Sequence, residues 1–580
     1  MHVAKITTRR VDKAGAVREY VSHLLRRTYR AEGKVKHETL ANLSPLPAPA
    51  IEAVRACLAG KTMIVVGDQL EITRSLPHGH VAAVVAQAHS LGLPGLLGPA
   101  GRARDLAFAL IVARVCEPAS KLATTRWWVD TTLAHDLGIA DASTDEVYAA
   151  LDWLVAQQDS IEAKLVRRHL TGAANPDRLA LFDLSSSWMT GRCCPLAARG
   201  YSRDGKKGLP QIEYGLLTDP EGRPVAVRVL AGNTADPTAF ALIATQIREK
   251  FNLRDMVMVG DRGMITTARI DALRELGGLG WLTALRAPTI AALAADDGPL
   301  QMSLFDQTNL AEITHPDYPG ERLIACRNPA LAAERARKRL ALLKATDLEL
   351  TAIAAAVQAG RLAGAGKIGV RIGKVIGKYK MAKHYTLTIT EDTFTFSRNQ
   401  AAIDAEAALD GIYVIRTSVP TTQMKPGKVV ATYKNLSLVE RDFLSLKSID
   451  LDLRPIRHYT ETRVKAHVFL CTLAAYLTWH LRQAWAPLTF TDENRPEPAD
   501  PVAPARRSTA ADRKAATKTT TDDLPAHSLG SLLKHLATLT RNHVRVAGHD
   551  EASFDLLATP TSTQRRAFQL LGATIPQHLK

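Results

Sequence analysis

A chain of 580 residues is long enough to form several domains with sizeable cores. Its hydrophobic content of 46% is normal for a globular protein, and 74 Lys and Arg residues against 58 Asp and Glu give a formal charge of +16. This excess of positive charge favours a polyanionic partner, most simply nucleic acid.

The cysteines and the apolar segments argue against extracellular and membrane classes. The six cysteines form no C-x-x-C pair, so a zinc knuckle or finger is not expected, and adjacent Cys193 and Cys194 suit neither a disulfide nor zinc. The N-terminus has no signal-peptide apolar region. The apolar segment 468–479 is too short to span a bilayer and predicts a buried helix. We therefore expect a reduced, cytoplasmic chain without a membrane partner.

The first 178 residues divide into two predicted regions. Residues 1–95 are predicted to form a small mixed module, in which the first 50 residues carry ten Lys and Arg against four Asp and Glu, a net +6. Such a module is either an ordinary solvated surface or a DNA-contacting one. Residues 96–178 are predicted to be helical, with helices at 104–114 and 143–154; Ser143 and Glu146 have capping-box spacing.

The pattern changes to strands at residue 179. The predicted elements are strands at 179–184, 211–217 and 224–230, a helix from 236 to about 251, a strand at 255–260 and a helix at 266–276. Asp236 is predicted as the N-cap of its helix, with Pro237 at the first helical position. Three antiparallel strands, a helix, a parallel strand and a helix are the order of a ribonuclease H-like α/β core.

An insertion is predicted to interrupt this core, which would comprise residues 179–286 and 408–485. The insertion, 287–407, contains a predicted helix at 332–358, a strand at 385–390 and a stretch, 361–383, with seven Lys and Arg and no acid. A strand at 411–416 restores the core. The Pro- and Thr-rich stretch 486–527 is predicted as a linker or disordered arm, and 528–580 as a helical tail.

Three carboxylates stand in settings that predict a metal site. Asp183 interrupts an apolar strand, Asp261 ends another at a glycine-rich turn, and Glu440 lies on a predicted helix. A carboxylate beside a buried strand is costly unless it is paired or binds a cation, so together the three predict a site for a pair of Mg²⁺ ions. Each also has an ordinary reading: Asp183 as an ion-pair partner, Asp261 as a turn or cap residue, and Glu440 as the partner of Ser437 in a capping box.

The combination resembles the DDE transposases of bacterial insertion sequences, in the group with the signature Tyr-x2-Arg-x3-Glu-x6-Lys. Here the signature positions hold Tyr433, Leu436, Glu440 and Lys447, so the spacings agree and Leu436 stands where the signature has Arg. Further resembling stretches are 232–236, 261–264, 410–413 and 454–458.

The resemblance implies that Asp183, Asp261 and Glu440 are the catalytic triad and hold two Mg²⁺ or Mn²⁺ ions. It implies cleavage at the 3′ ends of the element and strand transfer into target DNA, by a dimer or larger assembly on terminal inverted repeats. Tyr433 and Lys447 would position phosphates near the cut.

Two basic segments are further DNA-binding candidates. The loop containing Arg203, Lys206 and Lys207 follows the strand of the first aspartate, so it is predicted to contact phosphates. Lys374, Lys378 and Lys380 belong to the basic stretch of the insertion and are predicted to bind DNA away from the active site. Both segments have an ordinary reading as a solvated surface.

Three alternatives stay open at the level of sequence. A ribonuclease H-like nuclease without strand transfer would have the same active site. For a catalytically inactive, transposase-derived DNA-binding protein, the presence of all three carboxylates is an argument against, and the Leu436 departure keeps the alternative open. A basic scaffold with incidental acids would bind neither Mg²⁺ nor Mn²⁺.

Overall fold

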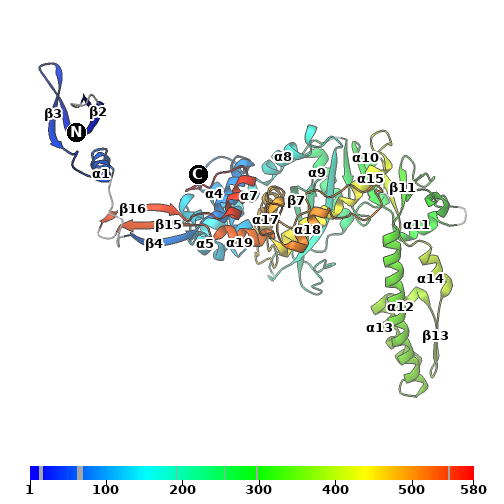
Figure 1. Cartoon of the computed structure of the whole chain (residues 1–580). Helices are drawn as coiled ribbons and strands as arrows, with labels where there is room; N and C mark the ends of the chain where they lie inside the picture. Colours follow the sequence, from blue (N-terminus) through cyan, green and yellow to red (C-terminus); the bar gives the residue numbers. More distant parts are fainter. Residues whose placement is uncertain are drawn as a thin grey trace. The chain divides into compact units, whose positions relative to one another are not determined.

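The computed structural model describes residues 1–11, 17–61, 70–190, 193–253, 255–295, 298–546 and 549–579. The chain divides into two compact units, one made of Met1–Ser75 and Arg541–Ala558 and the other of Leu76–Thr540 and Thr559–Lys580 (Figure 1). Each unit is described separately.

The first unit contains two small antiparallel sheets. One has the order β1 (His2–Val11), β2 (Val17–Ala31), β3 (Lys34–Asn42), and is followed by α1 (Ala48–Leu58). The other has the order β16 (His549–Leu557), β15 (Thr540–Val546), β4 (Leu70–Pro77). The mixed character expected of the N-terminus is therefore present, but the unit ends near residue 75 rather than 95. The expected helical tail, 528–580, is helical only in part, because β15 and β16 form a hairpin within it.

The second unit begins with helices that pack around a long buried one. These helices are α2 (Gly79–Ser90), α3 (Leu93–Leu97), α4 (Arg102–Cys116), α5 (Lys121–Val129), α6 (Thr132–Asp136), α7 (Thr144–Ala156) and α8 (Gln158–His169). The capping box of α7 is confirmed, since the Ser143 side chain accepts from Glu146 N and the Glu146 side chain accepts from Ser143 N. The predicted buried helix is α17 (Glu461–Ala484). Every helix in the described ranges is too short or too polar to cross a membrane.

The centre of the second unit is a mixed eight-stranded sheet. Its order is β10 (Leu310–Ile313), β11 (Arg322–Arg327), β14 (Ile412–Thr417), β9 (Leu279–Ala284), β8 (Met256–Val259), β5 (Leu179–Trp188), β6 (Gln211–Thr218), β7 (Pro224–Ala231). The predicted part is confirmed: β5, β6 and β7 are antiparallel, and β8 runs parallel to β5. β9 continues the parallel part, and β14 joins it antiparallel.

Helices cover both faces of this sheet. Phe182 of β5 packs against Phe240 of α9 (Asp236–Glu249), with ring centroids 6.1 Å apart. On the opposite face, Tyr214 of β6 packs against Phe443 of α16 (Leu436–Leu444), at 5.7 Å. Because side chains alternate along a strand, Asp183 points to the face opposite Phe182, the face that α16 covers. α10 (Thr267–Leu276) packs against β9 and α9.

The insertion forms a body with its own hydrophobic core, although it is shorter than expected. It comprises α12 (Pro329–Gln358), α13 (Ala365–Tyr379), β12 (Tyr385–Ile389), β13 (Phe394–Arg398) and α14 (Gln400–Ala407) (Figure 1). Leu350, Ile372 and Phe394 belong to this core. The predicted boundary at 287 was wrong, because after α11 (Ala287–Leu293) the chain adds β10 and β11 to the central sheet before α12 begins.

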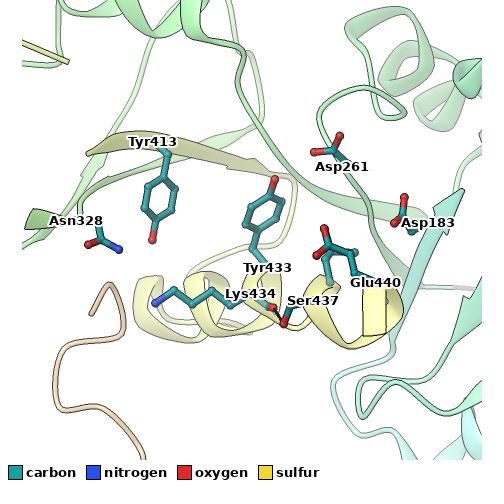
Figure 2. A pocket seen from close by; sticks show the side chains of 9 residues that line it. Asp183, Asp261, Asn328, Tyr413, Tyr433, Lys434, Ser437 and Glu440 are labelled. Carbon is teal, nitrogen blue, oxygen red and sulfur yellow. Dashed lines mark hydrogen bonds between the residues drawn. The ribbon is translucent and has the colours of Figure 1, made fainter. Parts of the chain in front are cut away.

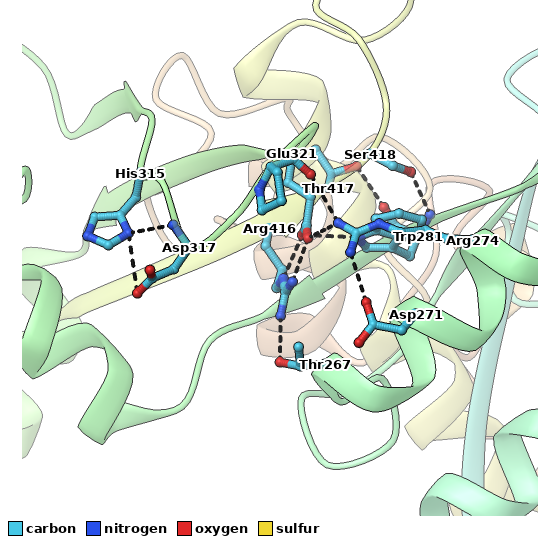
Figure 3. A network of polar contacts seen from close by, with 11 residues as sticks. Thr267, Asp271, Arg274, Trp281, His315, Asp317, Glu321, Arg416, Thr417 and Ser418 are labelled. Carbon is cyan, nitrogen blue, oxygen red and sulfur yellow. Dashed lines mark hydrogen bonds and ion pairs between the residues drawn. The ribbon is translucent and has the colours of Figure 1, made fainter.

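A buried carboxylate ties the two sides of the insertion together (Figure 3). Glu321, just before β11, accepts two hydrogen bonds of 2.6 Å from Arg416 of β14. It also accepts from Arg274 of α10 at 2.8 Å and from the Trp281 indole of β9 at 3.1 Å. Since Glu321 is only 7% exposed, these donors offset the cost of burying its charge.

Residues 486–527 are not the linker or disordered arm that their composition suggested. They contain α18 (Thr509–Thr517), whose Lys514 is buried and donates to the carbonyls of Ala486 and Thr489. Val502 is fully buried. The segment therefore packs on the second unit, which closes with α19 (Leu529–Ala537) and α20 (Ser562–Leu570).

Candidate active site

A pocket of about 320 Å³ brings the three predicted carboxylates together (Figure 2). Its lining residues are Asp183, Asp261, Asn328, Tyr413, Tyr433, Lys434, Leu436, Ser437 and Glu440. Asp183, Asp261 and Glu440 lie at one end, while Asn328 and Tyr413 lie at the other. The pocket thus combines residues from both sides of the insertion.

The register of two parallel strands explains why the aspartates are neighbours. Leu181 of β5 is opposite Val259 of β8, so Asp183 and Asp261 each follow this pair by two residues. Asp183 accepts a hydrogen bond from Leu184 N at 2.7 Å. Burial, with added repulsion from Asp261 and Glu440, raises the pKa of Asp183 to about 7.

Asp261 holds a turn but does not cap the following helix. Its carbonyl accepts from Met264 N and Ile265 N, and its carboxylate is 3.4 Å from Gly263 N. The N-cap of α10 is Thr266, so the capping role considered for Asp261 is not observed. The carboxylate itself is exposed to the pocket.

Glu440 does not form the capping box that its spacing allowed. α15 (Pro426–Lys434) and α16 meet at Asn435, which is the N-cap of α16. Ser437 is already inside α16, and its hydroxyl donates to the carbonyl of Lys434 at 2.8 Å. The Glu440 side chain, one turn into the helix, points toward the two aspartates (Figure 2).

Tyr433 and Leu436, the other signature positions nearby, line the same pocket. Tyr433 lies in α15, before the helix of Glu440 rather than within it. Burial raises the pKa of the Tyr433 phenol, and the charges of Asp261, Glu440 and Asp183 add to the effect, so the phenol keeps its proton. Leu436 contributes an apolar surface where the signature has a cation.

Lys447 lies outside the pocket in a buried ion pair. It belongs to a π-helical turn, Ser445–Ile449, that extends α16. Its ammonium is 2.8 Å from the Asp204 carboxylate, and the two side chains are only 7% and 2% exposed. Arg454 pairs with the same carboxylate. This placement does not support the phosphate contact predicted for Lys447, because its charge is already offset and screened from solvent.

In the loop of Arg203, Lys206 and Lys207, predicted to contact phosphates, Arg203 is already engaged in ion pairs. Arg203 pairs with Asp236 at 2.6 Å and with Glu213 at 3.4 Å. The prediction that Asp236 is an N-cap was wrong: Ala235 is the N-cap of α9, and Asp236 is its first residue. Lys206 and Lys207 are exposed, with the Lys206 ammonium 6.0 Å from the centre of the Trp188 ring.

The lysines predicted for the insertion lie on an exposed surface and do not line the pocket. Lys374 and Lys378 are on α13, and Lys380 follows it. All three are exposed, and Lys378 pairs with Glu349 at 2.6 Å. They remain candidates for DNA contacts away from the active site.

Sequence reasoning missed Asn328, Tyr413 and Lys434. Asn328 caps α12 through Leu331 N, a signal visible in the Asn-Pro pair before the helix. The Lys434 ammonium donates to the carbonyls of residues 501–503 at 2.6, 3.0 and 2.9 Å. This contact holds the segment expected to be a linker beside the pocket, and no local pattern could have revealed it.

The donor set suits a hard divalent cation in kind. Asp183, Asp261 and Glu440 offer carboxylate oxygens, the preferred ligands of Mg²⁺, and their mutual repulsion is what a cation would relieve. In the described ranges, however, no group of three His, Cys, Asp or Glu side chains is placed to hold a metal ion as the structure stands.

The comparisons with known proteins concern the family of the chain. No curated protein matches the chain. Among solved structures, the chain is similar to piggyBac transposase in a cryo-EM structure of its synaptic complex with hairpin DNA, with 8% identity, a TM-score of 0.33, and coverage of 79% of this chain and 76% of that chain. Residues 161–477, more than half of the chain, match the family described as "Transposase DDE domain". Residues 4–64 match "IS1634 family transposase, N-terminal domain".

Proposed function

The chain belongs to the IS1634 family of DDE transposases, and from this membership we propose that Asp183, Asp261 and Glu440 are its catalytic carboxylates. The observation that carries the proposal is one pocket that all three side chains line. Asp183 and Asp261 enter it from the ends of two paired parallel strands, and Glu440, 179 residues after Asp261, enters it from α16. The reaction is cleavage at the 3′ ends of the element followed by strand transfer.

These carboxylates would hold two Mg²⁺ or Mn²⁺ ions. When bound, the metal ions supply Lewis-acid activation of the phosphodiester and lower the pKa of the attacking water. Asp183 would act as a carboxylate, a form that a nearby cation favours. The Tyr433 phenol, which keeps its proton, would donate to a phosphate oxygen, and Leu436 would exclude water from the side of the pocket it covers.

Family membership and the order of the sheet also support proposals about the core, the signature, the partners and the location of the protein. The core is proposed to be ribonuclease H-like, because three antiparallel strands are followed by parallel β8 and β9. We propose that Tyr433, Leu436 and Glu440 are the signature positions that act in the pocket. Lys447, the last signature position, would support the end of α16 through its ion pair with Asp204. The partners are proposed to be terminal inverted repeats and target DNA, bound by a dimer or larger assembly. Six free thiols favour a cytoplasmic location.

The proposal is tested by strand cleavage. Purified protein is incubated with duplex DNA carrying the terminal inverted repeat of the element, with Mg²⁺ or Mn²⁺, and the strand breaks and joined products are mapped. Glu440→Gln keeps the shape of the side chain and removes its charge. We expect a metal-dependent break at the 3′ end that slows by roughly a hundredfold or more in the variant, since metal-assisted stabilisation is worth several kcal/mol.

Glu275→Gln is the matched control, because Glu275 is exposed on α10 and lines no part of the pocket. Equal cleavage by Glu440→Gln and the wild type would remove Glu440 from the site. Cleavage without joining would favour a nuclease without strand transfer. DNA binding without cleavage by the wild type would favour a non-catalytic descendant.

A further inference from the structure

A second cavity, of about 150 Å³, is lined by more positive than negative side chains. Arg114, Lys121, Arg454 and Arg457 line it, and Asp452 is the one carboxylate among its lining residues. Water occupies about 30 Å³ per molecule in the liquid, so the cavity has room for the five heavy atoms of a phosphate group. It lies between the start of α5, the segment 452–458 and the start of α17.

Two of these cations are buried against neutral partners. Arg114, 5% exposed, donates to the carbonyls of Ala119 at 2.7 Å and Leu451 at 3.4 Å. Lys121, 4% exposed, has its side-chain nitrogen 3.1 Å from His467 Nδ1. Burial and the charge of Arg114 lower the pKa of Lys121 to about 7, and a bound anion would favour its charged form. Throughout the described part of the chain, no carboxylate forms an ion pair with Arg114, Lys121 or Arg457. Burying a charge without a counter-charge is costly, so Arg114 and Lys121 destabilise the fold unless an anion completes the site.

The histidines beside the cations are neutral at neutral pH. His467 Nε2 lies 3.1 Å from the carbonyl of Leu453, so Nε2 carries the proton and Nδ1 accepts from Lys121. Burial, followed by the charges of Lys121 and Arg114, keeps the pKa of His467 well below its ordinary value. Burial and the charges of Lys121, Arg463 and Arg114 lower the pKa of His458 to about 3. Neither histidine adds charge at neutral pH, and both can remain beside a bound anion.

We propose that this cavity is a phosphate-binding site that seats one backbone phosphate of the DNA on which the protein acts. Arg457, an exposed lining residue, would meet the phosphate from the solvent side, and the buried Arg114 and Lys121 would complete its coordination. The choice of DNA as the source of the phosphate rests on the proposed function.

The cavity is also connected to α16, the helix that carries Glu440. Arg454 lines the cavity and pairs with Asp204, which in turn pairs with Lys447 of the π-helical turn after α16. A phosphate seated here would therefore contact the same charge network that anchors the end of the helix carrying Glu440. The Arg454–Asp204–Lys447 ion pairs thus link the seated phosphate to the end of α16.

The test uses inorganic phosphate and DNA as separate probes. Phosphate, compared with chloride at matched ionic strength, should raise the melting temperature of the wild type, and this increment should disappear in Lys121→Met. In chloride, Lys121→Met should melt no lower than the wild type, because it removes a buried cation that has no counter-charge. For binding to duplex DNA carrying the terminal repeat, the slope of log K against log salt should shrink by about one in Lys121→Met and in Arg457→Gln.

Arg513→Gln, an exposed arginine on α18, is the control and should leave both readouts unchanged. No phosphate increment in the wild type would overturn the site. A lower melting temperature of Lys121→Met with an unchanged salt slope would make Lys121 a structural residue. If phosphate raises the melting temperature but neither variant changes the slope of log K against log salt, the assignment of the phosphate to DNA would be overturned.

If Lys121→Met does not fold, the salt slope of DNA binding by Arg457→Gln, a change at an exposed residue, still tests the site. Glu440→Gln should keep the phosphate increment while losing cleavage, so failure of the proposed function and failure of this site give different results.

Discussion

Among single residues, Asp204 has the clearest energetic role. Its carboxylate is 2% exposed and offsets the charges of Lys447 and Arg454. Asp204→Asn would leave both cations without a counter-charge, so we expect the free energy of unfolding to fall by about 3–5 kcal/mol. Urea denaturation at neutral pH measures this change.

The companion variant for Asp204 is the double change with Lys447→Met. Removing one of the two stranded cations should recover part of the lost stability, and the cycle gives the coupling between the two residues. A loss below about 1 kcal/mol in Asp204→Asn alone would mean that the pair is effectively solvent-screened. Lys447 would then again be a candidate for a DNA contact.

Leu436 allows the departure from the signature to be tested directly. It lines the catalytic pocket, so Leu436→Arg would place a cation beside the carboxylates and within reach of DNA. We expect tighter DNA binding, with the salt dependence of log K steeper by about one unit of slope. Filter binding across a salt series measures this. Leu436→Met is the apolar control, and an arginine variant with the same slope as Leu436→Met would show that the position faces no phosphate.

Residues whose environment is set by local sequence could be predicted, and those set by distant partners could not. Asp183 and Asp261 end up together because each follows an apolar run that became one of two parallel strands in register. By contrast, Lys447 and its partner Asp204 are 243 residues apart. Nothing near Lys447 indicates that its charge is already paired, so an exposed role was predicted from spacing alone.

At the scale of elements, apolar runs predicted strands well and composition predicted order poorly. β5 and β8 were found because their buried residues form apolar runs, and β6 and β7 because they flank the turn sequence Asp-Pro-Glu-Gly at 219–222. The segment 486–527 is rich in Pro and Thr, yet Val502 and Lys514 anchor it to the second unit. Few anchors are enough to order a polar segment, and composition does not reveal them.

The position of α16 depends on the turn between β6 and β7. Gly222 in that turn has φ +81°, and a Cβ there would lie 2.7 Å from Leu438 Cβ on α16. Gly222→Ala would combine a strained backbone, about 1–2 kcal/mol, with overpacking against the helix that carries Glu440. We expect unfolding to become easier by about 2–4 kcal/mol and cleavage to slow.

Gly172→Ala separates the two causes, because Gly172 has φ +62° but open space around its Cβ position. Gly172→Ala should lower the free energy of unfolding only by the cost of the strained backbone, and it should leave cleavage unchanged. The idea that the turn positions α16 fails if Gly222→Ala and Gly172→Ala are equally stable and equally active in the cleavage assay.

At the scale of the whole molecule, the catalytic pocket depends on segments far apart in the chain. Asp183 and Asp261 precede the insertion, Glu440 follows it, and Glu321 with Arg416 joins the sheet across it. The insertion keeps a separate core, so it can project from the second unit without contributing to the packing around the carboxylates. The site is therefore assembled only when the central sheet is complete.

The segment 500–503 closes this assembly through Lys434. The Lys434 ammonium donates to three consecutive carbonyls, and Asn328 donates to the carbonyl of Val502 at 3.2 Å. Lys434→Met removes the three charge-assisted bonds, each worth about 1.5–3 kcal/mol at most, so the segment should open locally before the sheet unfolds. Limited trypsin digestion should then cut faster at exposed Arg506 and Arg507, leaving the rest of the second unit intact.

Lys428→Met is the matched control for this release. Lys428 lies on the same helix, α15, but its ammonium pairs at the surface with Asp177 at 3.3 Å. Such an exposed pair contributes about 0–1 kcal/mol, so its loss should leave digestion at wild-type speed. Equal digestion of Lys434→Met and Lys428→Met would mean that the fully buried side chain of Val502 anchors the segment by itself. The hydrogen bonds to Lys434 would then only align the segment beside the pocket.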